Sequence, residues 1–462
     1  AQTGVFKSEH TLRGCGAQSG VFKSEHTLRG YSNLRFVSKR VLLGNQNKGY
    51  NGALFGAGAH FIGWSVWMFK NPKLLTLFFT MIVVMIGFGI VIPIMPFYVE
   101  SFGMGGTGMG AMMALFSIMQ FLFSPFWGKL SDRYGRKKIM LIGALGNGVT
   151  MIFTGLVPNY PLLLLARGLA GILSAATMPT AMAYIGDSTD ERGRGGGMGL
   201  IGAAMGVGMV IGPGLGGWMS EISLAAPFFL AGGLSLLALL PIWFILPESL
   251  PEAKRTREKV ALRGPQLGEL WRALRGPLGF LLFLAFLVNF ALANFEGIFG
   301  LYADARYEYG PAQVGTIMMV IGIVSSLVQI ALTGPATHRF GENWVIKVSL
   351  LSSVLGFVLM SLAEGAAVIL LTVGFFVFSN AMLRPAIMSL TSKRALGGQG
   401  EALGMNNAFQ SLGRVAGPLW AGMMFDVNIN FPYWSAALIM LGTFAYALWA
   451  MRPETLSTDY AD

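Results

Sequence analysis

Charged residues, cysteine and histidine are all scarce in this sequence. Asp, Glu, Lys and Arg make up 12% of the 462 residues, about half of what a soluble protein carries to meet water. The single cysteine, Cys15, excludes an intrachain disulfide, and only His338 among four histidines lies beyond residue 60, so a His/Cys metal site has no ligands. With 54% hydrophobic residues, the chain is expected to meet lipid over most of its surface.

The formal net charge of +11 could indicate a nucleic-acid partner, but its distribution argues against one. Beyond the first 67 residues the cations lie almost entirely in short loops between apolar runs. That distribution is typical of membrane orientation and differs from a phosphate-binding patch. We expect lipid, small molecules and protons as partners, and no nucleic acid.

The first 67 residues differ from the rest of the chain. The string AQTGVFKSEHTLRG at 1–14 returns almost unchanged at 17–30, and neither copy has a helical apolar face. We expect 1–67 to be a leader outside the membrane fold: a misassigned start, an added extension or an unstructured tail. A basic, acid-poor targeting segment is the alternative.

Long apolar runs fill most of the remaining chain. Crossing about 30 Å of hydrocarbon takes about 20 apolar residues in a helix, and lipid offers no partner to strand edges. The predicted fold class is therefore an all-α membrane protein with twelve transmembrane helices. The runs lie at 74–98, 107–127, 138–156, 162–185, 198–218, 224–246, 278–303, 312–333, 346–362, 366–391, 403–424 and 432–451.

The polar, basic stretch 247–277 divides these runs into six and six. We expect 68–246 and 278–452 to form two pseudo-symmetric six-helix bundles, with 247–277 as a linker and 453–462 as a tail. The alternation of cation-rich loops predicts that both termini and the linker face the cytoplasm.

The two halves also repeat at a near-constant offset. Gly128 and Gly135 return 206 residues later as Gly334 and Gly341. Two repeated bundles with a site between them are typical of alternating access, in which one half rocks against the other.

The loop after the second run reads GKLSDRYGRKK at 128–138. Its glycines permit close helix ends, and Asp132 among five cations can exchange salt-bridge partners or neutralise a helix N-terminus. A plain turn with positive-inside charges is the simpler interpretation, but such a turn does not require this particular combination of glycines and charged residues. We assign conformational roles to Gly128, Asp132, Arg133, Gly135 and Arg136.

Small residues and prolines recur at fixed spacings within the runs. Small residues let helices approach closely and proline bends a helix, although a glycine-rich span can also be a plain packing surface. We assign conformational roles to Gly199, Gly208, Gly212, Pro213, Gly216 and Gly217 in the fifth run, Pro93 and Pro96 in the first, Gly417 and Pro418 in the eleventh, and Asp187 just after the fourth.

Together these strings resemble the major facilitator superfamily. The 128–138 loop matches its loop signature, and the fifth run matches the signature of its drug/proton antiporters. The resemblance covers 68–452 and is closest to Gram-positive quinolone and multidrug efflux pumps, notably around Phe295-Glu296 and Arg384-Pro385-Ala386. It implies the major facilitator fold and efflux driven by the proton gradient without a cofactor. We accordingly expect a monomer in the bacterial cytoplasmic membrane.

Ionised side chains inside a span cost about 2.5–3.5 kcal/mol and need a partner or a wet cavity. Four are expected there: Arg167, Glu296, Arg384 and Arg414. Glu296 is the only carboxylate well inside a span and shares a helix face with Asn289. The resemblance implies that Glu296 couples transport to protons, since the matching position of the quinolone pumps is acidic. A permanent structural ion pair is the alternative.

The three arginines are expected to line the same cavity. The family pattern implies that Arg167 can join a proton relay; a head that reaches the outer interface is the alternative. Arg384 follows Asn380 by one helical turn, and the resemblance makes it a cavity arginine. The relatives carry a second acid where this chain has Ala381, so exchange of one proton per drug is the simpler scheme.

Arg414 departs from the relatives and forms a polar stripe with Asn406, Asn407 and Gln410. Three arginines around one glutamate would repel purely cationic compounds and favour zwitterionic or carboxylate-bearing amphiphiles. Flexible apolar walls suit varied ligands. We assign substrate contacts to Arg384, Arg414, Asn289, Asn380, Asn406 and Gln410, and to the aromatic residues Phe290, Phe295, Phe376 and Phe409.

These features predict a secondary transporter that exports small amphipathic drugs in exchange for protons. The alternatives are an exporter of a metabolite such as a sugar or polyamine, and a non-transporting membrane receptor or scaffold. The sequence contains no nucleotide-binding loop and no nucleophile–base arrangement. We therefore expect neither an enzyme nor ATP-driven export.

Overall fold

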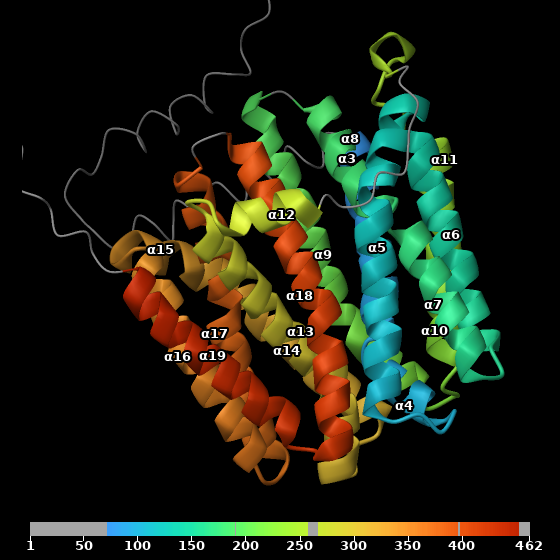
Figure 1. Ribbon diagram of the computed structural model, residues 1–462. Coiled ribbons are helices and arrows are strands. Elements are labelled where there is room, and N and C mark those ends of the chain that lie inside the picture. The colour runs from blue at the N-terminus through green and yellow to red at the C-terminus, as the bar shows by residue number, and fades with distance from the viewer. Residues whose placement is uncertain (1–71, 190, 257–266, 396–397, 452–462) are drawn as a thin grey trace, which may run out of the picture. The chain divides into compact units, whose positions relative to one another are not determined.

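The computed structural model describes residues 72–189, 191–256, 267–395 and 398–451. The expected leader 1–67 and tail 453–462 lie outside the described residues, as does part of the linker. Figure 1 shows the helical elements. They are α3 (Pro72–Val91), α4 (Met95–Glu100), α5 (Gly106–Tyr134), α6 (Arg136–Leu156), α7 (Tyr160–Ser174), α8 (Thr177–Ser188), α9 (Glu191–Met219), α10 (Ala226–Leu237), α11 (Leu239–Phe244), η1 (Glu252–Lys254), α12 (Leu267–Leu274), α13 (Gly279–Tyr307), α14 (Pro311–Val328), η2 (Gln329–Thr333), α15 (Gly334–Phe340), α16 (Glu342–Leu362), α17 (Ala366–Lys393), α18 (Gln399–Val427) and α19 (Phe431–Ala450).

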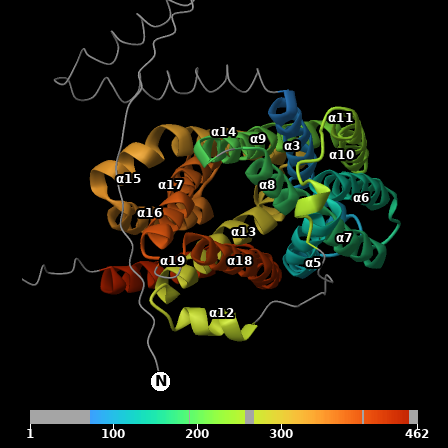
Figure 2. The same ribbon diagram turned by 90° about the horizontal axis from the view of Figure 1, so that it is seen from above.

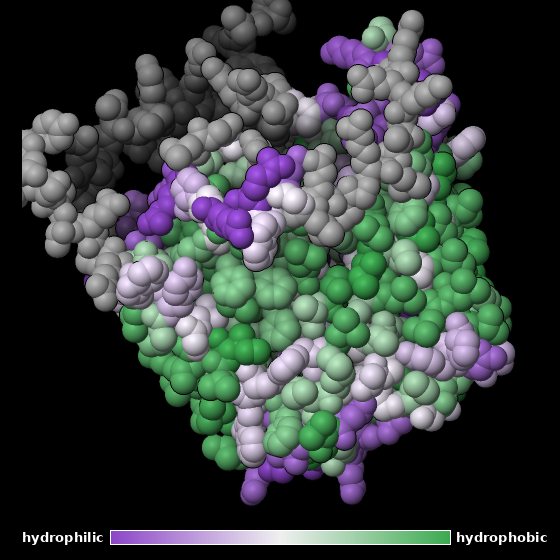
Figure 3. Space-filling model, in the orientation of Figure 1, coloured by the Kyte–Doolittle hydropathy of each residue, from purple (hydrophilic) through white to green (hydrophobic). Residues whose placement is uncertain are grey.

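Each of the twelve apolar runs coincides with one helix or one interrupted helix. Among the described residues, eleven of these are long and apolar enough to cross a membrane. The remaining one is α18, a 29-residue helix whose polar stripe lowers its mean hydropathy. Figure 3 shows a broad apolar band between two hydrophilic ends. Large apolar side chains such as Leu371 and Leu438 are exposed, which is the surface that a chain in lipid requires.

Several of the interruptions coincide with proline. A turn that contains Pro93 separates α3 from α4, and Pro96 lies in the first turn of α4. In the second half, Pro335 follows the π-helical turn η2 and occupies the start of α15. Proline has no N–H and clashes with the preceding turn, so the chain bends at these positions.

The helices of each half pack mainly on one another. Contacts join α3 to α9, α6 to α10 and α5 to α7 in the first half, and α16 to α17 and α19 in the second. Between the halves, α5 lies against α18 and α9 against α14 (Figure 2). We call the end that carries Gly135, Gly341 and α12 the linker face, and the end that carries Gly103 and Gly365 the far face.

The two halves are packed together toward the far face and are apart toward the linker face. A Cβ on Gly422 of α18 would overlap a backbone carbonyl at the start of α5. A Cβ on Gly217 of α9 would lie 2.7 Å from the carbonyl of Pro311 in α14. Nearer the linker face, a Cβ on Gly404 of α18 or Gly199 of α9 would meet no described atom within 4 Å. In Figure 1, the distance between α5 and α18 likewise increases toward the linker face.

Gly422→Ala should open the far face. The added methyl group forces α18 away from α5, and overpacking of this kind costs about 1–3 kcal/mol. The measurement is the distance between spin labels at Ser101→Cys and Asn428→Cys, in a background with Cys15→Ser, which should lengthen. Gly404→Ala adds the same methyl group to the same helix in open space and should leave the distance unchanged. Equal effects of the two variants would contradict the packing described.

Candidate substrate and proton site

Three ionisable side chains come together where the two halves separate. Glu296 of α13 is partly exposed, and Arg384 of α17 and Arg414 of α18 are exposed. The carboxylate of Glu296 interacts electrostatically with both guanidinium groups. Within the described residues no cation lies within the 4.0 Å that defines an ion pair with Glu296. Glu296 is therefore near two positive charges without being locked to either.

A chain of hydrogen bonds holds the side chain of Arg384 in position. Arg384 donates from Nη2 to Oε1 of Gln410 at 3.2 Å, and Gln410 donates from Nε2 to Oδ1 of Asn406 at 2.5 Å. Asn406 in turn donates from Nδ2 to Oγ1 of Thr391 at 3.4 Å. Asn406 and Gln410 are buried, so their amide groups fix the position of Arg384 and are not exposed to a ligand in this conformation.

The exposed part of the α18 stripe consists of other residues. Asn407 and Arg414 are exposed and Ser411 is partly exposed. Ser411 accepts a bond from Nη2 of Arg414 at 3.4 Å and donates to the carbonyl of Asn407 at 3.0 Å. Ser411 was not among the predicted contacts, although its place one helical turn after Asn407 could have indicated it.

Arg167 does not join the central cluster in this conformation, which corrects the expectation that all three arginines share a cavity. Its side chain is 5% exposed, and its guanidinium group lies 5.7 Å from the ring centre of Phe228. It interacts electrostatically with Tyr98, whose hydroxyl donates to the carbonyl of Thr154 at 2.8 Å. Nε and Nη2 of Arg167 have no hydrogen-bond partner among the described residues. Arg167 is thus enclosed within the first bundle.

The aromatic residues expected to line the cavity lie in the interior instead. Phe295 is 1% exposed and Phe376 is 0% exposed, and their ring centres are 5.2 Å apart. Phe290 and Phe409 are also buried. Adjacent residues on a helix point about 100° apart, so Phe295 faces the interior of the second bundle although its neighbour Glu296 is partly exposed.

Asn289 and Asn380, which were also predicted to bind substrate, are likewise internal. Asn289 donates from Nδ2 to the carbonyl of Ala285 at 2.9 Å. Asn380 donates from Nδ2 to Oγ of Ser353 and to the carbonyl of Phe376, both at 3.2 Å. Both side chains are buried, so in this conformation they bond to the second bundle itself.

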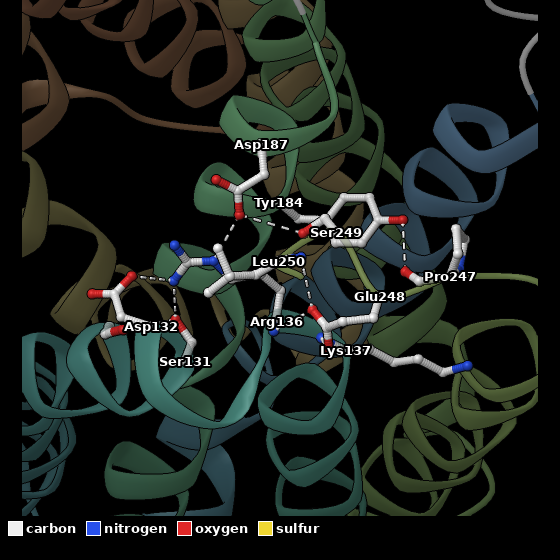
Figure 4. A network of polar contacts seen from close by, with 11 residues as sticks. Ser131, Asp132, Arg136, Lys137, Tyr184, Asp187, Pro247, Glu248, Ser249 and Leu250 are labelled. Atoms are coloured by element: carbon white, nitrogen blue, oxygen red, sulfur yellow. Dashed lines mark hydrogen bonds and ion pairs between the residues drawn. The ribbon is translucent and has the colours of Figure 1, made fainter. Parts of the chain in front are cut away.

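The 128–138 loop forms a polar network on the linker face (Figure 4). Arg136 is its centre: Nη1 lies 2.6 Å from Oδ1 of Asp132, and Nε lies 2.9 Å from Oδ2 of Asp187. Nη1 also donates to Oγ of Ser131 at 2.6 Å. The guanidinium group therefore links the end of α5, the start of α6 and the end of α8.

Glu248 completes this network and was missed by the sequence analysis. Its carboxylate accepts the backbone N–H of Arg136 at 2.8 Å and that of Lys137 at 3.3 Å, at the start of α6. A helix N-terminus carries partial positive charge and unpaired N–H groups, so a carboxylate stabilises it. Gly135 has φ of 102°, and a Cβ there would overlap the Glu248 carboxylate. Glycine is therefore required at this position.

A second carboxylate that the sequence analysis missed connects the halves on the far face. Asp426, near the end of α18, accepts the backbone N–H of Gly106 at 2.7 Å and that of Thr107 at 2.8 Å. These are the first residues of α5, so a side chain of the second half caps a helix of the first. Nothing in the sequence pairs residue 426 with residues 106 and 107.

The small residues of the fifth run pack against two different helices. Gly208, Gly212 and Gly216 of α9 pack against the backbone of α3, whereas Gly217 packs against α14 of the other half. A Cβ on Gly199 would meet no described atom, and the same holds for Gly128. Across the halves, Pro418 of α18 contacts Gly110 of α5, and Pro96 of α4 contacts Gly300 of α13. Most of these residues therefore provide close helix packing, and some of that packing lies between the two halves.

Two repeated helix bundles that are closed at one end, with ionisable groups exposed between them at mid-span, define the class of secondary membrane transporters. The family model of the Major Facilitator Superfamily matches residues 77–418 and 291–459. The chain belongs to this superfamily.

Characterised relatives lie in the same superfamily. The chain is 35% identical to multidrug resistance protein 1 of Bacillus subtilis over 373 residues, which cover 80% of this chain and 94% of the relative. It is 32% identical to the quinolone resistance protein NorA of Staphylococcus aureus over the same shares of each chain. Multidrug resistance protein 2 of Bacillus subtilis is also 32% identical, over 78% of this chain and 90% of the relative.

Solved structures of lower identity share the fold. The human organic anion transporter MFSD10 superposes with a TM-score of 0.62 at 22% identity, over 81% of this chain and 99% of that one. The nucleoside transporter NupG superposes with a TM-score of 0.67 at 16% identity, over 82% and 98%. The predicted fold is thereby confirmed.

Asp426→Ala should weaken closure of the far face. The change removes the acceptor of two N–H groups at the start of α5, and loss of such a cap costs about 1 kcal/mol, which is about a five-fold change in the closed-to-open ratio. The same far-face spin-label pair measures this ratio. Asp426→Asn keeps one acceptor oxygen and should have a smaller effect, and Glu221→Ala, which removes an exposed far-face carboxylate, should have none. An unchanged distance distribution in Asp426→Ala would refute the cap.

Proposed function

We propose that this protein exports small amphipathic compounds in exchange for protons, with Glu296 as the proton-binding group. The observation that carries the proposal is the position of Glu296: it is accessible, electrostatically coupled to Arg384 and Arg414, and not held in a direct ion pair within the described residues. A carboxylate locked in an ion pair would be a poor proton carrier, because protonation would leave a buried arginine without its counter-charge. The names of the bacterial relatives support the assignment to drug efflux.

The coupling follows from the cost of burying charge. When the halves close over the site from the linker face, water leaves Glu296, Arg384 and Arg414. An ionised group in a dry, low-dielectric space is costly unless its charge is compensated. A substrate with groups of complementary charge can compensate the cluster, and so can a proton on Glu296 in the return step. The two ligands therefore alternate, which is antiport of one proton per substrate molecule.

The direction of transport follows from the orientation. In our proposal the linker face and both termini lie in the bacterial cytoplasm, in agreement with the cation-rich loops. The described conformation then takes up substrate from the cytoplasm or the inner leaflet. Closure of the linker face and release of the Asp426 cap on the far face would expose the site to the outside, where the substrate leaves and a proton binds. The protein works as a monomer, driven by the proton gradient and not by a bound cofactor.

The charges around the site indicate the substrate class. Two arginines of the second half flank one carboxylate, so a carboxylate on the substrate can bind Arg384 or Arg414 while a cationic group approaches Glu296. We propose zwitterionic or carboxylate-bearing amphiphiles of the quinolone type as preferred substrates. Arg167, enclosed in the first bundle, becomes a substrate or proton contact only if the first bundle rearranges during the cycle.

Glu296→Gln should abolish proton-driven efflux and preserve substrate binding, because the amide has nearly the same shape but neither releases nor accepts the coupled proton. The measurement is efflux from proteoliposomes with an imposed pH gradient, beside substrate binding in detergent. Glu364→Gln, in an exposed far-face turn, is the control and should transport normally. Wild-type rates of gradient-driven efflux in Glu296→Gln would remove Glu296 from the mechanism.

Arg384→Ala and Arg414→Ala should each reduce the preference for zwitterions over cations. A hydrogen bond to a charged group contributes about 1.5–3 kcal/mol, so transport of zwitterions should fall by about 10- to 100-fold while transport of cationic compounds is retained or increased. Competition between the two substrate classes measures the preference. Arg339→Ala, which removes a linker-face arginine that stacks on Phe340, is the control. Loss of both substrate classes to the same degree would refute a role in discrimination.

A further inference from the structure

The ion pair between Arg136 and Asp187 joins two helix ends of the first bundle. Arg136 begins α6 directly after Gly135, and Asp187 lies in the last turn of α8. Their contact of 2.9 Å fixes the start of the third membrane helix to the end of the fourth on the linker face. We call this pair the first clasp.

A second ion pair occupies the equivalent place in the other bundle. Glu342 begins α16 directly after Gly341, and Lys393 is the last residue of α17. Nζ of Lys393 lies 2.5 Å from Oε1 of Glu342. Ser389 of α17 also donates to Oε1 of Glu342 at 2.9 Å. The second clasp therefore fixes the start of the ninth membrane helix to the end of the tenth.

The two clasps correspond residue by residue in the internal repeat. Glu342 stands 206 positions after Arg136, and Lys393 stands 206 positions after Asp187. The preceding glycines share the same offset and the same backbone conformation, with φ of 102° at Gly135 and 78° at Gly341. The repeated geometry is preserved, but the signs of both charges are reversed.

The partial charges at helix ends explain how an ion pair with either order of signs can be accommodated. A helix start favours a negative side chain and a helix end favours a positive one. Glu342 and Lys393 follow this rule. Arg136 and Asp187 oppose it, and in that half Glu248 supplies the negative charge by accepting two N–H groups at the start of α6. The linker, through Glu248, thus supports the helix start that carries Arg136 of the first clasp. The sequence around it, Pro247-Glu248-Ser249, returns as Pro453-Glu454-Thr455, beyond the described residues.

We propose that Glu342 and Lys393 are positioning residues for transport, as the charge-inverted counterpart of Arg136 and Asp187. Each clasp holds the linker-face ends of two helices together, so that each bundle moves as one body when the linker face opens and closes. This assignment rests on the proposed transport function. Lys393 is 63% exposed, so the contact alone adds little to folding stability; its role is to fix the relative position of α16 and α17.

Charge exchange tests the proposal directly. Glu342→Arg and Lys393→Asp, made singly, each place like charges together and should lower the initial transport rate by about five-fold. Combined, they install the pair of the first clasp at the second, but no described residue replaces Glu248 at the start of α16, so transport should recover only in part, to a rate clearly above that of either single variant. Arg394→Asp makes the same charge change one residue further along and should have little effect.

A readout independent of transport is the distance between spin labels at Trp344→Cys and Ala395→Cys, in a background with Cys15→Ser. Its distribution should broaden in each single variant and narrow again in the double variant. If a charge reversal prevents folding, Glu342→Gln with Lys393→Gln removes both charges and should still broaden it. Folded single variants with wild-type distances and rates, or a double variant that is folded but no closer to wild type than either single variant, would overturn the proposal. A wild-type protein that does not export compounds would contradict the proposed function alone, since the distances would still report the clasp.

Discussion

The conformation of this protein depends on the cost of placing charge in a hydrocarbon environment. Glu296, Arg384 and Arg414 lie at mid-span, and each needs either a partner or water. In the described conformation Gln410 bonds Arg384, while all three ionisable side chains retain exposure. Separation of the halves on the linker face supplies that exposure. The electrostatics of the site and the position of the two bundles therefore cannot change independently of each other.

The far face supplies the opposing constraint. Close approach of α5 to α18 and of α9 to α14 requires glycine at Gly422 and Gly217, and Asp426 adds a polar contact at the same end. Contacts of this kind are lost nearly all at once, because a packed interface has few intermediate arrangements. A closed far face and an open linker face thus form one state of a two-state system. A ligand shifts such a system only through its different affinity for the two states.

The sequence predicted the membrane helices well because their length and apolarity are local properties, set by the thickness of the bilayer. The contiguous motif indicated that Asp132 could pair with neighbouring cations, but nothing local paired Arg136 with Asp187 or with Glu248. The sequence failed where the answer depends on contacts between distant segments. Nothing local shows that Arg167 is enclosed beside Phe228, that Phe295 and Phe376 pack on each other, or that Asp426 caps α5. The sequence placed the polar residues in the correct spans. It did not predict which of them face the site.

The repeat explains how one fold combines symmetric motion with an asymmetric site. The linker-face helix ends recur in both halves: a glycine precedes the third helix of each bundle, and an ion pair joins that helix to the next. The chemistry does not recur, since Glu296, Arg384 and Arg414 all come from the second half, and Arg167, buried in the first half, lies apart from them. A symmetric hinge needs only that equivalent helix ends be joined, and an ion pair does this with either sign. In the proposed mechanism, by contrast, a single set of charges must distinguish a proton from a substrate. Selection can therefore keep the geometry of the repeat while the signs of its charges diverge.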